Sequence, residues 1–299
     1  MKKTLIFIFI LLIATFSFAQ NEVSVFKQDS LKKDSIQKEL IISQRIADYN
    51  ILRKGRLSIS WGWNRATYGR STIRFWGEGY DFKILKVVGK DRPTHELKTY
   101  FHPTKLTIPQ YNFRVGYFIS NKLSVSFNVD HMKYVLDNSQ IATVHGTIDS
   151  SASEEWAGNY DNKLMEIKND FVKFEHTDGL NYLTAELDYN SIIHDAKNFS
   201  IDLIAGVGVG AVVPKTNAIL FNTTGADTFH WAGVGLNGQI GARFYFYKRF
   251  FVSPMIKVGY LYMPNIATNG LEIDKASQKI TFFEKYITFG YQMNIFSNK

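Results

Sequence analysis

Eight charged side chains at alternate positions of strand-like segments are the residues of this chain whose types and spacing could do chemistry. They are Arg114, Asp130, Glu186, Asp188, Asp202, Arg243, Lys257 and Glu284. In each segment apolar residues alternate with polar or small ones, so all eight fall on the polar face. Opposite charges in a poorly hydrated interior must pair to be tolerated. We expect a polar network there, with a small binding cavity or a proton-linked site as the alternative.

His131 is the histidine that lies clearly inside a strand-like segment, and it is the candidate base for a hydrolytic reaction. A hydrolase needs serine, histidine and a carboxylate on one face, so that the base reaches the nucleophile. Alternation places His131 on the apolar face between Val129 and Lys133, and Lys133 stands where a lipid A deacylase has a hydroxyl. We therefore expect no enzyme and no catalytic residue, and we expect His131 and Lys133 to contact lipid at an outer rim.

Metal and cofactor chemistry has no support in the residue spacing. No pair of histidines, or of histidine and carboxylate, has the spacing of a metal site. Gly206, Gly208 and Gly210 alternate along a strand and do not form a phosphate-binding turn. The chain has no cysteine, which excludes disulfides and thiolate ligands. We expect no metal and no cofactor.

The elements that would position these residues are eight strand-like segments. They are residues 57–64, 111–119, 123–134, 182–191, 199–211, 232–246, 251–262 and 282–296. Their connections are alternately short and long, as in barrels whose short turns share one end. The pattern predicts an all-β fold, an eight-stranded antiparallel up-and-down transmembrane β-barrel whose narrow interior is filled by side chains. A three-residue turn at 120–122 would place Arg114 opposite Asn128.

The long connections leave two questions open. Residues 71–84 also alternate, so residues 71–101 form either two extra barrel strands, making ten, or a hairpin beyond the membrane, which we favour. Residues 65–110 are rich in Lys and Arg, and residues 136–180 in Asp and Glu. These two segments either dock together, or the basic one binds sugar phosphates, or both are solvated loops.

The first fifty residues have a different character. Lys2 and Lys3 precede an apolar run that ends in Ser17-Phe18-Ala19, which predicts a signal peptide over residues 1–19. No other stretch approaches about 18 uninterrupted apolar residues, so no membrane-spanning helix is expected. Residues 20–54 are predicted to be a periplasmic extension, helical or flexible, and residues 55–299 the barrel. The net charge of +8 falls to +6 once Lys2 and Lys3 leave with the signal peptide. This excess favours anionic lipid as a partner, and no nucleic-acid module is recognisable.

The chain resembles the outer-membrane β-barrel proteins of the Bacteroidota, the group that includes the PorT-like barrels. The resemblance covers roughly residues 55–299 and rests on the export signal, the amphipathic strands and the aromatic last strand. Three segments resemble an uncharacterised branch of this group: Gly79–Phe82, Ile108–Phe113 and Asp130–Tyr134. The resemblance implies placement in the outer membrane, but no shared activity and no catalytic residue.

Together these observations predict an outer-membrane barrel with a packed polar lumen. Its role is expected to be structural or binding, through surface loops and a rim that contacts lipopolysaccharide. The expected partners are outer-membrane lipid, lipopolysaccharide and a periplasmic or outer-membrane protein, but not nucleic acid. The alternatives are a lipid-modifying barrel enzyme and a narrow channel.

Overall fold

The computed structural model describes residues 31–42 and 53–295, apart from residues 101, 103, 106–107, 224, 226–227 and 269–272. The predicted signal peptide and Phe296 lie outside the described residues. Residues 31–42 form an exposed helix, which confirms the helical part of the predicted extension. Within the described ranges, no helix is long and apolar enough to span a membrane.

The strands among the remaining described residues belong to one antiparallel sheet. One short helix, α2 (Leu97–Tyr100), interrupts it. The strands are β1 (Arg56–Tyr68), β2 (Ser71–Gly77), β3 (Tyr80–Val87), β4 (Gly89–Lys90), β5 (Tyr111–Phe118), β6 (Leu123–Leu136), β7 (Ile141–Ile148), β8 (Gly158–Glu166), β9 (Val172–Asp195), β10 (Phe199–Pro214), β11 (Asn217–Leu220), β12 (Gly233–Phe246), β13 (Phe250–Ala267) and β14 (Lys275–Asn294).

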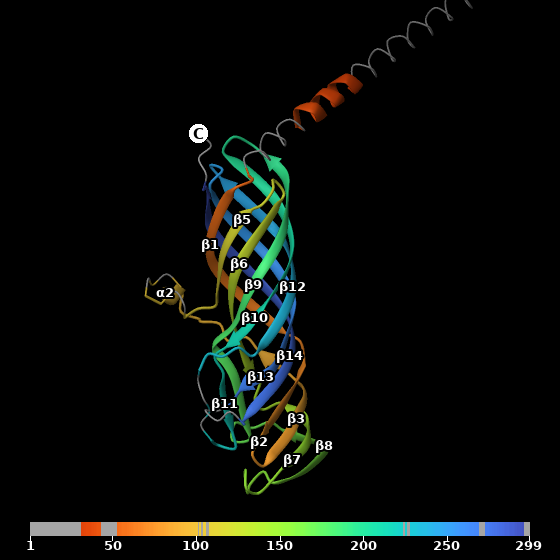
Figure 1. Cartoon of the computed structure of the whole chain (residues 1–299), viewed down its shortest axis with the longest axis vertical. Helices are drawn as coiled ribbons and strands as arrows, with labels where there is room; N and C mark the ends of the chain where they lie inside the picture. Colours follow the sequence, from red (N-terminus) through yellow and green to blue (C-terminus); the bar gives the residue numbers. More distant parts are fainter. Residues whose placement is uncertain are drawn as a thin grey trace, which may run out of the picture. The chain divides into compact units, whose positions relative to one another are not determined.

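Eight of these strands close into a ring, which confirms the predicted antiparallel barrel. The order is β1-β5-β6-β9-β10-β12-β13-β14, and β14 pairs with β1 to complete the circle. The predicted register is observed, with Arg114 opposite Asn128. The short connections at residues 119–122, 196–198 and 247–249 lie at the end of the ring where β1 begins and β14 ends (Figure 1). We call this the turn end.

The sheet has fourteen strands in the part of the chain that the structure describes, more than the eight predicted. β2 pairs with the first residues of β14, β3 pairs with β2 and β7, and β7 pairs with β8. Residues 71–87 are thus a hairpin outside the ring and do not make a ten-stranded barrel. We call β2, β3, β4, β7, β8 and β11, with the adjoining ends of β6, β9, β13 and β14, the cap. It lies at the end of the barrel opposite the turn end (Figure 1).

The chemistry of both sheet faces reverses within single strands. On β6 the inward side chains change from Asn128 and Asp130 to the apolar Met132 and Tyr134, all of them buried. At the same level the outward side chains change from apolar, such as Phe127, to His131 and Lys133. The ring is therefore polar inside and apolar outside, whereas the cap has the apolar interior of a water-soluble domain.

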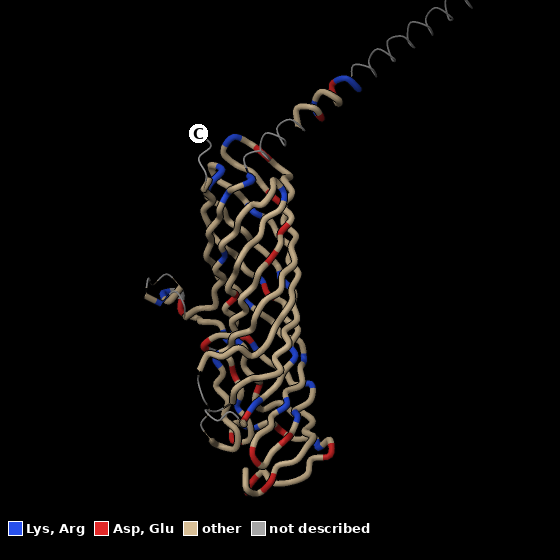
Figure 2. The backbone as a smooth tube through the Cα atoms, viewed as in Figure 1, with Lys and Arg blue, Asp and Glu red and all other residues tan. Residues whose placement is uncertain are grey.

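The outward face of the ring carries an apolar belt. On β10 the belt runs from Phe199 to Val209, and Val207 is 64% exposed. These ten residue steps of about 3.3 Å, on a strand tilted by about 40°, span about 25 Å, which is the height of the apolar band on transmembrane barrels. Figure 2 shows charged positions at the turn end, in the half that carries the cap and at mid-ring, where those of β9 and β13 include the buried Glu186, Asp188 and Lys257.

The cap replaces most of what the sequence predicts to be long loops. Its core contains Phe75, Phe82, Phe171 and Phe174, all fully buried. The basic segment and the acidic segment dock together through the β3–β7 pairing. Across them, Lys90 Nζ lies 2.7 Å from Asp137 Oδ2, and Arg92 Nη1 donates to Glu175 Oε2 over 3.2 Å. Of the three alternatives for the two segments, docking is the one observed.

Candidate functional site

Six of the eight predicted lumen residues form one connected network inside the ring. Glu186 lies at its centre and accepts from both cations: the Arg114 guanidinium forms an ion pair with it, and Lys257 Nζ lies 2.8 Å from its Oε1. Asp188 lies at one side, with Oδ2 at 3.8 Å from Arg114 Nη2. Gln239 Nε2 ties the two carboxylates together, donating to Glu186 over 2.8 Å and to Asp188 over 2.6 Å.

Lys257 connects the network to a second pair of carboxyl groups. Its ammonium group forms an ion pair with Asp130, and both side chains are fully buried. Asn112 Nδ2 donates to Asp130 over 2.6 Å and to Glu284 over 2.9 Å. Removing Lys257 would thus leave Asp130 with Asn112 as its side-chain partner. Each cation of the network is thus paired with a buried carboxylate, so removing one partner would leave the other charge uncompensated.

Tyr286 is a network member that the charge pattern alone does not reveal. Its hydroxyl accepts from Arg114 Nη1 over 2.7 Å and donates to Gln239 Oε1 over 2.6 Å. The Arg114 guanidinium carbon lies 5.5 Å from the centroid of the Tyr286 ring. Alternation places Tyr286 on the inward face, but its contact with Arg114 depends on β14 and β5 both pairing with β1. Sequence periodicity does not specify this long-range closure of the ring.

The other two predicted lumen residues, Asp202 and Arg243, lie nearer the turn end. They are register partners on β10 and β12. Asp202 forms a buried ion pair with Arg53, which precedes the first strand and belongs to the predicted extension. Arg53 also lies over the rings of Phe118 and Tyr245, at 5.3 Å and 5.6 Å. The chain entering the barrel thus fills the mouth of the lumen, a contact that no sequence pattern predicts.

The structure places His131 and Lys133 on the outward face, but both are engaged by the protein. The His131 ring stacks on Tyr111 with 4.8 Å between centroids, and its Nδ1 lies 2.7 Å from Asn181 Oδ1. Lys133 Nζ donates to the carbonyl oxygen of Ile108 over 2.9 Å. His131 is only 6% exposed. His131 is therefore largely covered by protein, and the contact of His131 and Lys133 with lipid stays a prediction.

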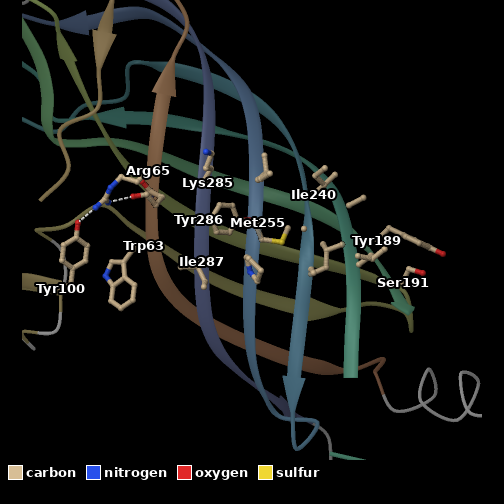
Figure 3. A pocket seen from close by; sticks show the side chains of 18 residues that line it. Trp63, Arg65, Tyr100, Tyr189, Ser191, Ile240, Met255, Lys285, Tyr286 and Ile287 are labelled. Carbon is tan, nitrogen blue, oxygen red and sulfur yellow. Dashed lines mark hydrogen bonds between the residues drawn. The ribbon is translucent and has the colours of Figure 1, made fainter. Parts of the chain in front are cut away.

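A groove of about 1060 Å³ crosses the outward face of the ring (Figure 3). Two rows of outward side chains form its walls, and the backbone of the row between them forms its floor. The cap-side row is Arg65, Lys285, Ile256, Ile240, Ala205 and Tyr189, each opposite the next in the strand register. The other wall includes Trp63, Ile287, Pro254, Ala242, Leu203 and Ser191.

His176 is a fully buried histidine of the cap core. Its Nδ1 lies 2.9 Å from Thr216 Oγ1, and its ring packs against Tyr134 and Phe174. Burial, together with the proximity of His230, lowers the pKa of His176 to about 3. The unfolded chain takes up this proton near pH 6.5, before the folded chain does, so cap stability is expected to fall as the pH drops below about 6.5.

The expected slope is up to about 1.4 kcal/mol per pH unit between pH 6 and the folded pKa. Resistance of the cap to protease, measured from pH 7.5 to pH 5, tests this. The His176→Gln variant should lose most of the pH dependence, because glutamine does not titrate. The exposed His145→Gln variant is the control and should keep it. An unchanged slope in His176→Gln would assign the effect to other groups.

Comparison with known proteins gives distant likenesses in fold alone. No protein-family model matches the chain, and no curated protein matches it in sequence. The outer membrane protein AlkL is similar at 14% identity and a TM-score of 0.37, over 83% of this chain and 94% of AlkL. OprG from Pseudomonas aeruginosa has 11% identity and a TM-score of 0.37, over 81% and 97%. Ail of Yersinia pestis has 14% identity and a TM-score of 0.31, over 81% and 100%.

At these TM-scores no functional inference follows from the likenesses, and the barrel fold rests on the strand register. The more specific resemblance to PorT-like barrels of the Bacteroidota finds no support among these matches.

Proposed function

We propose that this protein is an integral outer-membrane anchor: a closed barrel that holds the cap outside the cell. The observation that carries the proposal is the reversal on β6, where both faces change chemistry between Asp130 and Met132. Both changes are explained at once if hydrocarbon surrounds the strands on the turn-end side of that level and water surrounds them on the cap side. The turn end then faces the periplasm, and the cap reaches the lipopolysaccharide sugars and any protein partner.

Side chains that fill the lumen favour the role of a membrane anchor over that of a channel. Arg114, Lys257 and their carboxylate partners occupy the middle of the ring, and Arg53 fills its mouth. An eight-stranded barrel has an interior just wide enough for such side chains. Ion permeation would require the paired charges to separate in a buried setting, which is costly.

The surroundings of His131 favour a role without catalysis. A histidine base must reach a nucleophile, but Nδ1 of His131 is bound to Asn181 and one ring face is covered by Tyr111. We propose that His131 stabilises the rim. Replacing His131 by alanine should leave the mass spectrum of lipid A unchanged, and a lost or shifted lipid species would instead support a lipid-modifying enzyme.

Conductance across planar bilayers tests the proposed anchor role. The reconstituted full chain is expected to give no stable open current, and so is the Arg53→Ala variant, because the network around Glu186 still closes the ring. A steady single-channel conductance of the unaltered protein would contradict the proposal and favour a narrow channel.

A further inference from the structure

Two cations lie directly opposite each other on the outward face of the ring. Arg65 on β1 is the register partner of Lys285 on β14, and both are exposed. No ion pair involves either side chain among the described residues. Like charges in directly opposed positions of an antiparallel pair repel and destabilise the sheet. An anion bound between them would remove that repulsion.

The Arg65 side chain is held in place by the protein. Its Nη1 donates to the carbonyl oxygen of Asn64 over 2.7 Å, and its Nη2 donates to the Tyr100 hydroxyl over 2.6 Å. The Tyr100 hydroxyl in turn donates to the carbonyl oxygen of Thr94 over 2.7 Å. The guanidinium therefore has a fixed position beside Lys285, a preorganised arrangement that lowers the entropic cost of binding an anion.

The apolar groove begins at this cation pair. Figure 3 shows Arg65 at one side of the groove and Tyr189 and Ser191 at the other. Between Lys285 and Tyr189 the groove crosses four strand spacings, about 19 Å. The residues between them are Ile256, Ile240 and Ala205, all apolar. In a tilted barrel this direction runs obliquely through the apolar belt, so the groove leads from the cap side toward the turn end.

We propose that Arg65 and Lys285 bind a phosphate of lipid A and that one of its acyl chains lies in the groove. This inference rests on the proposed function, which puts the cap-side leaflet outside the cell, where lipid A is found. A phosphomonoester carries nearly two negative charges and so neutralises both cations, whereas the phosphodiester of a phospholipid carries one. Trp63 and Ile287, on the groove's other wall, would contact the acyl chain.

Native mass spectrometry of the full chain in detergent, titrated with bisphosphorylated lipid A, tests the site. The Arg65→Gln/Lys285→Gln variant is expected to bind lipid A about tenfold more weakly or worse, since two charge-assisted contacts are lost. The Lys83→Gln/Lys279→Gln variant is the matched control. It removes the same charge from exposed cap residues and should bind like the unaltered protein. Heat-dependent gel mobility verifies that each variant is folded.

Two further ligands identify the source of the phosphate. Dephosphorylated lipid A should bind the unaltered protein as weakly as lipid A binds the double variant. Phosphatidylglycerol binding as tightly as lipid A would overturn the choice of lipid A, and equal binding by both double variants would overturn the site. Neither result bears on the proposed anchor role. That role is contradicted only if the barrel conducts ions or does not insert into a membrane.

Discussion

Replacing Lys257 by methionine is expected to lower the free energy of unfolding by about 3–5 kcal/mol, the usual cost of removing one partner of a buried ion pair. Lys257 is fully buried and is paired with both Asp130 and Glu186. Methionine fills a similar volume but supplies no charge. Glu186 retains Arg114, so the cost falls mainly on Asp130, which is left buried with the amide of Asn112.

Urea unfolding in lipid vesicles, followed by heat-dependent gel mobility, measures this loss. Adding Asp130→Asn to Lys257→Met should recover much of it, because the uncompensated charge is then gone. Lys83→Met is the control: Lys83 is exposed on the cap, and the change should stay within about 0.5 kcal/mol. A loss for Lys257→Met no larger than that of the control would mean that the lumen is hydrated and its charges are not structural.

Replacing Phe82 by alanine is expected to destabilise the cap by about 3–5 kcal/mol while the ring stays folded. Phe82 is fully buried, and its ring lies 5.4 Å from the rings of both Phe75 and Phe171. The three rings come from three segments: β2, β3 and the residue that precedes β9. The cavity left by alanine would therefore loosen the cap as a whole.

Limited proteolysis of intact vesicles detects this effect, because an opened cap exposes residues 65–110 and 136–180 to protease. The Phe82→Ala variant should be cut at a lower urea concentration than the unaltered protein, with its heat-dependent gel mobility unchanged. The control is Ile141→Ala, since Ile141 is 69% exposed on the same sheet. Equal cleavage of the two variants would indicate that the cap has no cooperative core.

The lumen could be predicted because a period of two assigns each side chain to one face without knowledge of its partners. Asp130, Glu186 and Lys257 follow from alternation alone. The short turn at residues 120–122 also fixes the register of Arg114. A slip of one residue in this hairpin would move the inward side chains of one strand to the outward face. Alternation and turn length are local properties of the chain, so both can be read from the sequence alone.

The cap could not be predicted because alternation does not say which medium lies on which side. On β7 the buried Ala142 and Val144 alternate with Thr143 and His145, a pattern that fits either a lipid-facing or a core-facing apolar row. Which of the two applies depends on β3, about sixty residues earlier in the chain, being the pairing partner.

Long-range contacts also account for two features that the sequence pattern does not predict. His131 is covered by Asn181, 50 residues away, and Arg53 pairs with Asp202, 149 residues away. Alternation assigns His131 to the outward face but does not say which residue covers it, and Arg53 precedes the first alternating segment. The groove at Arg65 and Lys285 likewise arises from closure of the first strand on the last.

Spin labels along β6 and on β3 of the cap measure most directly whether hydrocarbon surrounds the ring and water surrounds the cap. The chain has no cysteine, so single cysteines at Phe127 and Val129 in the belt, and at Lys133 and Lys83 beyond it, can be labelled one at a time. In vesicles, labels at 127 and 129 should collide with oxygen far more than with a water-soluble nickel complex, and labels at 133 and 83 should show the reverse. A label at 127 that nickel reaches as readily as one at 83 would contradict a membrane-embedded ring.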